Sequence, residues 1–207
     1  MKILQIDSSP LGDASVSRRL TKATVEAWRA HHPQAELVYR DLVADAPEHL
    51  TAERLAVIKF GKDSELTPVQ AEERALIDAI VEEFLSADVV VIGAPMYNFA
   101  VPTQLKAWID RLAQAGRTFR YTETGPVGLA GGRKVIVASS RGGIYTAGLE
   151  ALDHQEAYLR TILGFIGVTD IEFVRAEGLS MGPEHRERAV AEAHQQAKAS
   201  PGLAVAA

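Results

Sequence analysis

Short apolar runs separated by longer amphipathic stretches constrain the fold of this chain more than any other feature of its sequence. The run Val89–Gly93 is continuously apolar, as expected for a central parallel strand that is covered on both faces. Strands of this kind, alternating with helical patterns, are typical of a doubly wound α/β protein. We therefore predict a five-stranded parallel sheet with helices on both faces. Its strands are Lys2–Asp7, Glu36–Arg40, Val89–Gly93, Lys134–Ser139 and Ile171–Arg175.

The stretches between these strands carry apolar residues at helical spacing and have clear start signals. Thr67, Pro68 and Gln70, for example, form a capping-box pattern with proline at the first helical position. The expected helices are Val16–His31, Ala52–Phe60, Thr67–Leu85, Thr103–Ala115, Asp153–Ile166 and Pro183–Lys198. No repeat or linker divides the chain, so we expect one domain over residues 1–207 with a frayed tail at 200–207.

The composition narrows the classes of function. A formal net charge of −5 disfavours a nucleic-acid partner, which needs a basic face. Because the chain has no cysteine, disulfides, thiolate catalysis and cysteine-ligated metals are excluded. No histidines are paired at i, i+4 on a patterned face, so we expect no metal site. Every apolar run is too short for a membrane span, and the first residues do not resemble a signal peptide. We expect a cytoplasmic protein.

Ligands of doubly wound sheets bind outside the carboxyl ends of the strands, so the loops that follow strands one, three and four matter most. After strand one, the hydroxyls of Ser9, Ser15 and Ser17 and the backbone amides of Ser15, Val16 and Ser17 lie at a predicted helix start. A phosphate is favoured there by unpaired amides and the helix dipole. The alternative is that Ser15 only caps the helix. No P-loop and no G-x-G-x-x-G motif is present.

The other two loops suit a flat ring. The residues Met96, Tyr97, Asn98 and Phe99 follow a buried strand and form a suitable wall for an apolar ring, unless they pack as a core loop. After strand four, the paired glycines allow the backbone to approach a ligand closely, unless they form a simple turn. The candidate ligand residues of this loop are Ser140, Arg141, Gly142 and Gly143.

The chain resembles the bacterial FMN-dependent NADH:azoreductases, also described as NADH:quinone oxidoreductases, over nearly its whole length. The motifs that carry the resemblance are Ser8–Pro10 with Ser15 and Ser17, Ala94–Phe99, Thr118–Tyr121 with Gly125–Leu129, Ser140–Gly143 and Leu163–Gly167. The resemblance implies a flavodoxin-like fold and FMN. It implies that Ser9 and Ser15–Ser17 hold the phosphate, Met96–Phe99 line the isoalloxazine edge, and Ser140–Gly143 its pyrimidine side. Leu11 and Ala100 depart from the pattern, which leaves the substrate and donor preference open.

The function expected from this resemblance is transfer of electrons from NADH or NADPH to quinones and azo compounds by a ping-pong mechanism. Candidate substrate-pocket residues are Phe60, Phe119, Tyr121 and Tyr145; for Phe60, packing in the core is the less favoured alternative. The exposed aromatic surface and the resemblance both favour a homodimer in which one subunit covers the flavin of the other. The alternative is a flavodoxin-type electron carrier, or a non-catalytic module. Carriers are usually strongly acidic, whereas −5 is mild.

Overall fold

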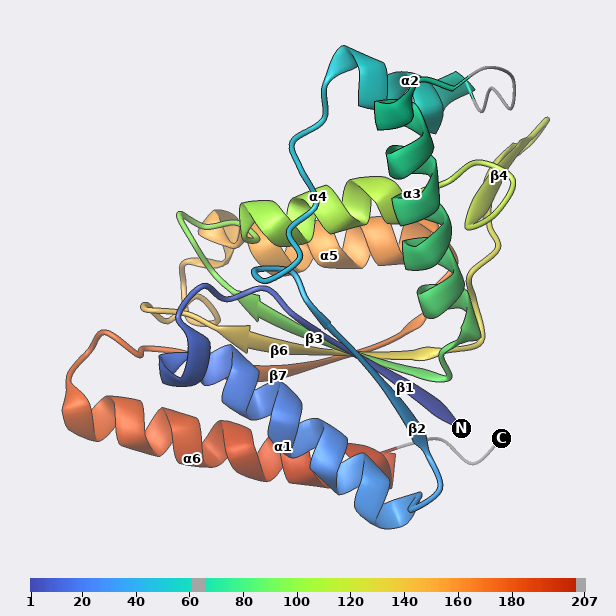
Figure 1. The fold of residues 1–207 in the computed structure, drawn as a ribbon. Coiled ribbons are helices and arrows are strands. Elements are labelled where there is room, and N and C mark those ends of the chain that lie inside the picture. Colours follow the sequence, from blue (N-terminus) through green and yellow to red (C-terminus); the bar gives the residue numbers. More distant parts are fainter. Residues whose placement is uncertain (61–65, 204–207) are drawn as a thin grey trace.

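A five-stranded parallel sheet forms the centre of the computed structural model, which describes residues 1–60 and 66–203, except the side chains of 59, 60, 202 and 203. The strand order is β2-β1-β3-β6-β7 (Figure 1). The strands are β1 (Lys2–Asp7), β2 (Glu36–Asp41), β3 (Val89–Pro95), β6 (Lys134–Ser140) and β7 (Asp170–Ala176). The predicted flavodoxin-like sheet is confirmed, and each strand lies within one residue or two of its predicted bounds.

Helices cover both faces of the sheet (Figure 1). On one face lie α1 (Val16–His31) and α6 (Pro183–Ala199); on the other lie α3 (Pro68–Ser86), α4 (Thr103–Leu112) and α5 (His154–Phe165), and α2 (Ala52–Phe60) packs beside α3. The capping box of Thr67 and Gln70 is present. Short 3-10 turns are η1 (Gly12–Ala14), η2 (Glu150–Leu152) and η3 (Ser200–Leu203). Ser200, expected in a frayed tail, is buried and accepts a hydrogen bond from the indole of Trp28.

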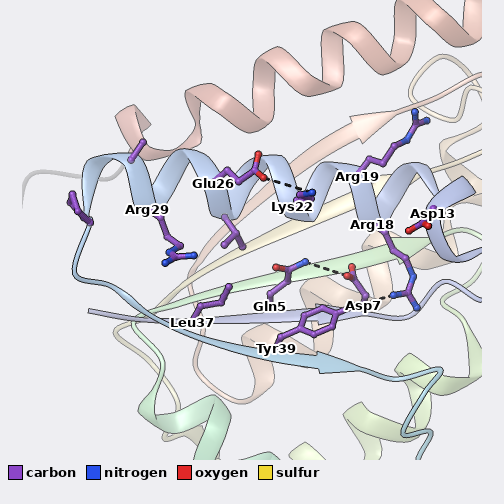
Figure 2. Close-up of a pocket in the computed structure, with 13 residues that line it drawn as sticks. Gln5, Asp7, Asp13, Arg18, Arg19, Lys22, Glu26, Arg29, Leu37 and Tyr39 are labelled. Atoms are coloured by element: carbon purple, nitrogen blue, oxygen red, sulfur yellow. Dashed lines mark hydrogen bonds and ion pairs between the residues drawn. The ribbon is translucent and has the colours of Figure 1, made fainter.

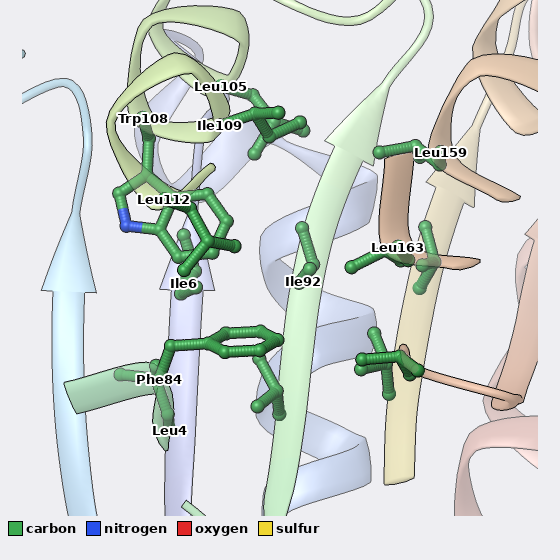
Figure 3. Packing of buried hydrophobic residues seen from close by; sticks show 14 of the residues in the cluster. Leu4, Ile6, Phe84, Ile92, Leu105, Trp108, Ile109, Leu112, Leu159 and Leu163 are labelled. Carbon is green, nitrogen blue, oxygen red and sulfur yellow. The ribbon is translucent and has the colours of Figure 1, made fainter. Parts of the chain in front are cut away.

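The core explains why the central strand is apolar without interruption. Val90 and Ile92 pack into the cluster beneath α3, α4 and α5, whereas Val89 and Val91 pack into the cluster beneath α1 and α6. Since alternate residues of a strand face opposite sides, a strand covered on both faces needs apolar residues at every position. Figure 3 shows the first cluster, in which Trp108 is only 1% exposed and is therefore a core residue.

A two-stranded antiparallel hairpin between α4 and β6 has no counterpart in the sequence prediction. It consists of β4 (Phe119–Thr122) and β5 (Gly125–Gly128). Gly128 packs directly against the backbone of Gly167, and a Cβ at Gly128 would overlap that backbone. These strands are only four residues each, and β5 contains two glycines and a proline, so the sequence gives little strand signal there.

Candidate functional site

The loop after β1 and the first turn of α1 form a cluster of hydroxyls at the carboxyl edge of the sheet. Ser9, Ser15 and Ser17 are all buried. Ser15 caps α1, since its hydroxyl accepts a hydrogen bond from the Arg18 amide at 3.3 Å, and it lies 3.1 Å from the Ser17 hydroxyl. We call Ser9, Ser15, Val16 and Ser17 the phosphate cradle. Strand order reverses between β1 and β3, which is the usual place for a ligand in this fold.

The backbone of the cradle is prepared for an anion. Within the described part of the chain, the N–H groups of Val16 and Ser17 donate no hydrogen bond, as is usual for the first residues of a helix. The N–H of Ser15, in contrast, already donates to the carbonyl oxygen of Gly12 at 3.0 Å. The prediction that three amides are available is therefore correct for Val16 and Ser17 only. Two amides, the nearby hydroxyls and the positive end of the helix dipole suit a phosphate group.

The loop after β3 presents an aromatic wall instead of packing into the core. Tyr97 and Phe99 are 38% and 42% exposed, and Asn98 is exposed as well. The backbones of Tyr97 and Ala100 donate to each other at 3.0 Å around a tight turn. Asn98 and Phe99 have positive φ values of 46° and 70°, which is unfavourable for phenylalanine. Backbone strain of this kind is concentrated at functional sites. Met96 ties the wall to the end of β6, because its N–H donates to the carbonyl of Ser140 at 2.8 Å.

The paired glycines after β6 have their carbonyl oxygens engaged and their amides available. The carbonyls of Arg141, Gly142 and Gly143 accept hydrogen bonds from the amides of residues 178–180. Over the described residues, the N–H groups of Gly142 and Gly143 have no such partner. A Cβ at Gly143 would lie 3.3 Å from the ring of Tyr145, so glycine also makes room for that ring. This arrangement suits donation to the polar edge of a ring.

The side chain of Arg141 does not join the site. It is fully buried, and its guanidinium donates to the carboxylates of Asp153 at 2.7 Å, Glu156 at 2.6 Å and Glu177 at 3.3 Å. Its backbone N–H donates to the carbonyl of Ala176. The guanidinium of Arg141, one of the candidate ligand residues, is therefore already engaged by carboxylates of the protein. Arg141 instead ties the end of β6 to the start of α5 and the end of β7.

Of the predicted substrate-pocket aromatics, Tyr145 does not lie beside Phe119 and Tyr121 within one chain. Tyr145 meets Phe99 edge to face, with ring centroids 6.2 Å apart. Phe119 packs against Phe165, the last residue of α5, with ring centroids 4.6 Å apart. Figure 1 shows the hairpin of β4 far from the carboxyl ends of β3 and β6. Tyr121 on this hairpin is 73% exposed. The side chain of Phe60 lies outside the described residues.

Two cavities lie near these loops. A groove of about 910 Å³ runs between α1 and the edge strand β2, with Tyr39 and Leu37 on its strand side (Figure 2). A second cavity of about 510 Å³ has mainly apolar lining and extends from Ala100 and Val101 along α4 to Tyr158 of α5. This second cavity adjoins the aromatic wall. Among residues 1–60 and 66–203, no group of three or more histidine, aspartate or glutamate side chains could hold a metal ion.

The electrostatics around β1 involve residues that the sequence analysis missed. Burial raises the pKa of Asp7, at the end of β1, although hydrogen bonding by Thr21 and the charge of Arg18 oppose the shift. Hydrogen bonds from Arg18 lower the pKa of Asp41, at the end of β2. An arginine directly after the Ser15-x-Ser17 pattern was the only sequence signal for this pair. Its partner, far along the chain, could not be identified without the fold.

Comparison with known proteins agrees with this geometry. Residues 1–200 match the family model described as flavodoxin-like fold. The FMN-dependent NADH:quinone oxidoreductase of Azospirillum brasilense is 66% identical over 198 residues, which cover 95% of each chain. The enzyme of that name from Acidovorax ebreus (strain TPSY) is 57% identical over 201 residues, covering 96% of this chain and 93% of the relative.

Solved structures give the same result. An azoreductase from Bacillus anthracis str. Sterne superposes with a TM-score of 0.89 at 31% identity, covering 97% of this chain and 98% of that one. An FMN-dependent NADH-azoreductase from Bacillus anthracis str. Ames Ancestor, in complex with FMN, gives 0.89 at 29% identity, covering 97% of each. The fold and the ligand loops thus define a member of the flavodoxin-like family. Within it, the chain belongs to the FMN-dependent NADH:quinone oxidoreductases.

None of the helices over residues 1–60 and 66–203 combines the length and apolar character needed to cross a bilayer.

Proposed function

We propose that this chain is an FMN-dependent oxidoreductase that transfers electrons from NADH to quinones and azo compounds. The observation that carries the proposal is the convergence of three ligand loops at the carboxyl edge of the sheet. The phosphate cradle, the aromatic wall and the paired glycines each match a different part of FMN. Relatives named FMN-dependent NADH:quinone oxidoreductase, which match 95% and 96% of this chain, support the quinone part of the proposal.

The residues of the chain fit FMN and its single terminal phosphate. The amides of Val16 and Ser17, without partners in the described structure, and the hydroxyl of Ser17 would hold the phosphate oxygens. Phe99 and Tyr97 would lie against the ring, and the amides of Gly142 and Gly143 would donate to its pyrimidine edge. FMN, when bound, supplies the redox chemistry by accepting hydride and passing electrons on. The protein supplies binding, orientation and exclusion of water.

The kinetic mechanism that we propose is ping-pong. If the wall of Tyr97 and Phe99 lies against the ring, one face of the flavin would be left on which a donor and then an acceptor stack in turn. The test is the steady-state rate of the FMN-loaded protein at varied NADH and benzoquinone concentrations. Parallel double-reciprocal lines are expected. Intersecting lines would show that both substrates bind together, and the absence of turnover would favour the electron-carrier alternative.

A homodimer would complete the site. The wall residues are exposed in one chain, while Tyr121 extends from a hairpin that lies far from them. A second copy related by two-fold symmetry could place its hairpin over the wall, and closed two-fold pairing is the commonest assembly. Sedimentation velocity at micromolar concentration should give about twice the mass of one chain. A monomer with full quinone reductase activity would contradict this part of the proposal. We further propose a cytoplasmic location, where NADH is available.

A further inference from the structure

The arginine that follows the phosphate cradle is fixed by several hydrogen bonds. Arg18 Nε donates to the carbonyl oxygen of Ser9 at 3.0 Å. Its Nη1 and Nη2 donate to the two carboxylate oxygens of Asp41, both at 2.7 Å. Its Nη1 also donates to the Tyr39 hydroxyl at 3.0 Å. Figure 2 shows Arg18 extending from α1 toward Tyr39 at the end of the groove. One guanidinium therefore connects the loop after β1, the first turn of α1 and the end of β2.

The positive charge of Arg18 is already neutralised by its ion pair with Asp41. Both side chains of the pair are mostly shielded, at 16% exposed for Arg18 and 23% for Asp41. The hydrogen bonds raise the pKa of Arg18 and lower that of Asp41, so both remain charged at neutral pH. Forked guanidinium–carboxylate pairs are strong and fix geometry as well as charge. An arginine held in this way donates to acceptors of the protein itself, including the backbone carbonyl of Ser9 in the cradle, and its charge is neutralised by Asp41.

Asp41 is itself held in place. One carboxylate oxygen accepts a hydrogen bond from the backbone of Val43 at 2.9 Å, and the adjacent Leu42 donates from its backbone to the carbonyl of Asp7 at 2.8 Å. The Arg18–Asp41 ion pair is therefore fixed to the ends of both β2 and β1. At Ser9 itself, the hydroxyl receives a long hydrogen bond of 3.4 Å from the Leu11 amide, so the 3.0 Å bond from Arg18 to the Ser9 carbonyl is the shorter of the two.

We propose that Arg18 is a positioning residue: seated on Asp41, it fixes the carbonyl of Ser9 and thereby presets the phosphate cradle without binding the phosphate itself. The inference rests on the proposed use of FMN. Preorganisation increases affinity because the protein does not have to order the loop when the ligand binds. The effect should be confined to ligands that carry the phosphate group.

The test compares flavin affinities of the apoprotein by quenching of flavin fluorescence. FMN and riboflavin form a matched ligand pair, because riboflavin lacks the phosphate. Arg19→Ala is the matched control for Arg18→Ala, since the neighbouring Arg19 is exposed and its side chain makes no hydrogen bond or ion pair with the described residues. We expect Arg18→Ala to weaken FMN binding by about 10-fold. Riboflavin affinity, and both affinities of Arg19→Ala, should stay within about 2-fold of the unmodified protein.

Asp41→Asn separates positioning from direct charge attraction. If Arg18 acts by position, loss of its carboxylate seat should weaken FMN binding, as Arg18→Ala does. If Arg18 attracted the phosphate directly, release from Asp41 would tighten FMN binding and overturn the proposal. Arg18→Lys keeps the charge but cannot form the fork, and it serves if Arg18→Ala does not fold. Unchanged FMN affinity in Arg18→Lys and Asp41→Asn would likewise refute positioning. Failure of the unmodified protein to bind FMN would instead refute the proposed function.

Discussion

Replacement of Ser17 by alanine tests the phosphate cradle at a single buried atom. The Ser17 hydroxyl lies 3.1 Å from that of Ser15 and has no other partner among the described residues. Ser17 is the second residue of α1 and not its cap, so alanine should leave the helix start intact. A hydrogen bond to a charged group contributes roughly 1.5–3 kcal/mol. Its loss should weaken FMN binding by about 10- to 150-fold.

The comparison with Ser15→Ala sharpens this test. Ser15 caps α1, so its replacement should also lower the stability of the apoprotein by about 1 kcal/mol, whereas Ser17→Ala should not. The assays are FMN titration of each apoprotein and its urea unfolding curve, with riboflavin as the ligand without phosphate. Unchanged FMN affinity in Ser17→Ala would show that the hydroxyl does not contact the phosphate. An equal loss of riboflavin affinity would show that the substitution acts on the ring site.

Further predictions concern the scaffold around the site. Gly128→Ala should destabilise the protein by at least about 1–3 kcal/mol in urea unfolding, because its Cβ would clash with facing backbone. Gly164→Ala, whose Cβ meets open space within α5, should be neutral or stabilising by about 0.5–1 kcal/mol, and equal effects would contradict the packing argument. Glu73→Ala leaves the fully buried Arg111 without its ion-pair partner at 2.7 Å and should cost about 3–5 kcal/mol, so a near-neutral result would refute that role. Burial raises the pKa of Asp7, so its ionisation lowers folded-state stability as pH rises above its ordinary value of 3.8. Asp7→Asn should therefore gain stability relative to the unmodified protein as the pH rises above about 4, and a pH-independent difference would contradict this.

The strands and helices could be predicted because their signals are local. The uninterrupted apolar run Val89–Ile92 predicts a strand buried on both faces, and its residues do alternate between the two core clusters. The cap at Thr67 is equally local. These signals predict where each strand ends, and in a doubly wound sheet the loops that follow those ends are the expected ligand loops.

The parts that could not be predicted depend on contacts between distant residues. Arg141 looked like a ligand residue in its loop, but its carboxylate partners come from α5 and the end of β7. Arg18 finds Asp41 on a different strand. Phe119 and Tyr121 lie at the other end of the sheet from Tyr145 within one chain, and their place on a hairpin after α4 could not be read from the sequence.

The measurement that tests the central claim most directly is the visible absorption spectrum of the purified protein after reconstitution with FMN. We predict a bound flavin band that NADH bleaches without oxygen and that an added quinone restores, and heat should release FMN. A protein that retains no flavin after exposure to excess FMN, that releases FAD, or whose bound flavin NADH does not bleach would contradict the account.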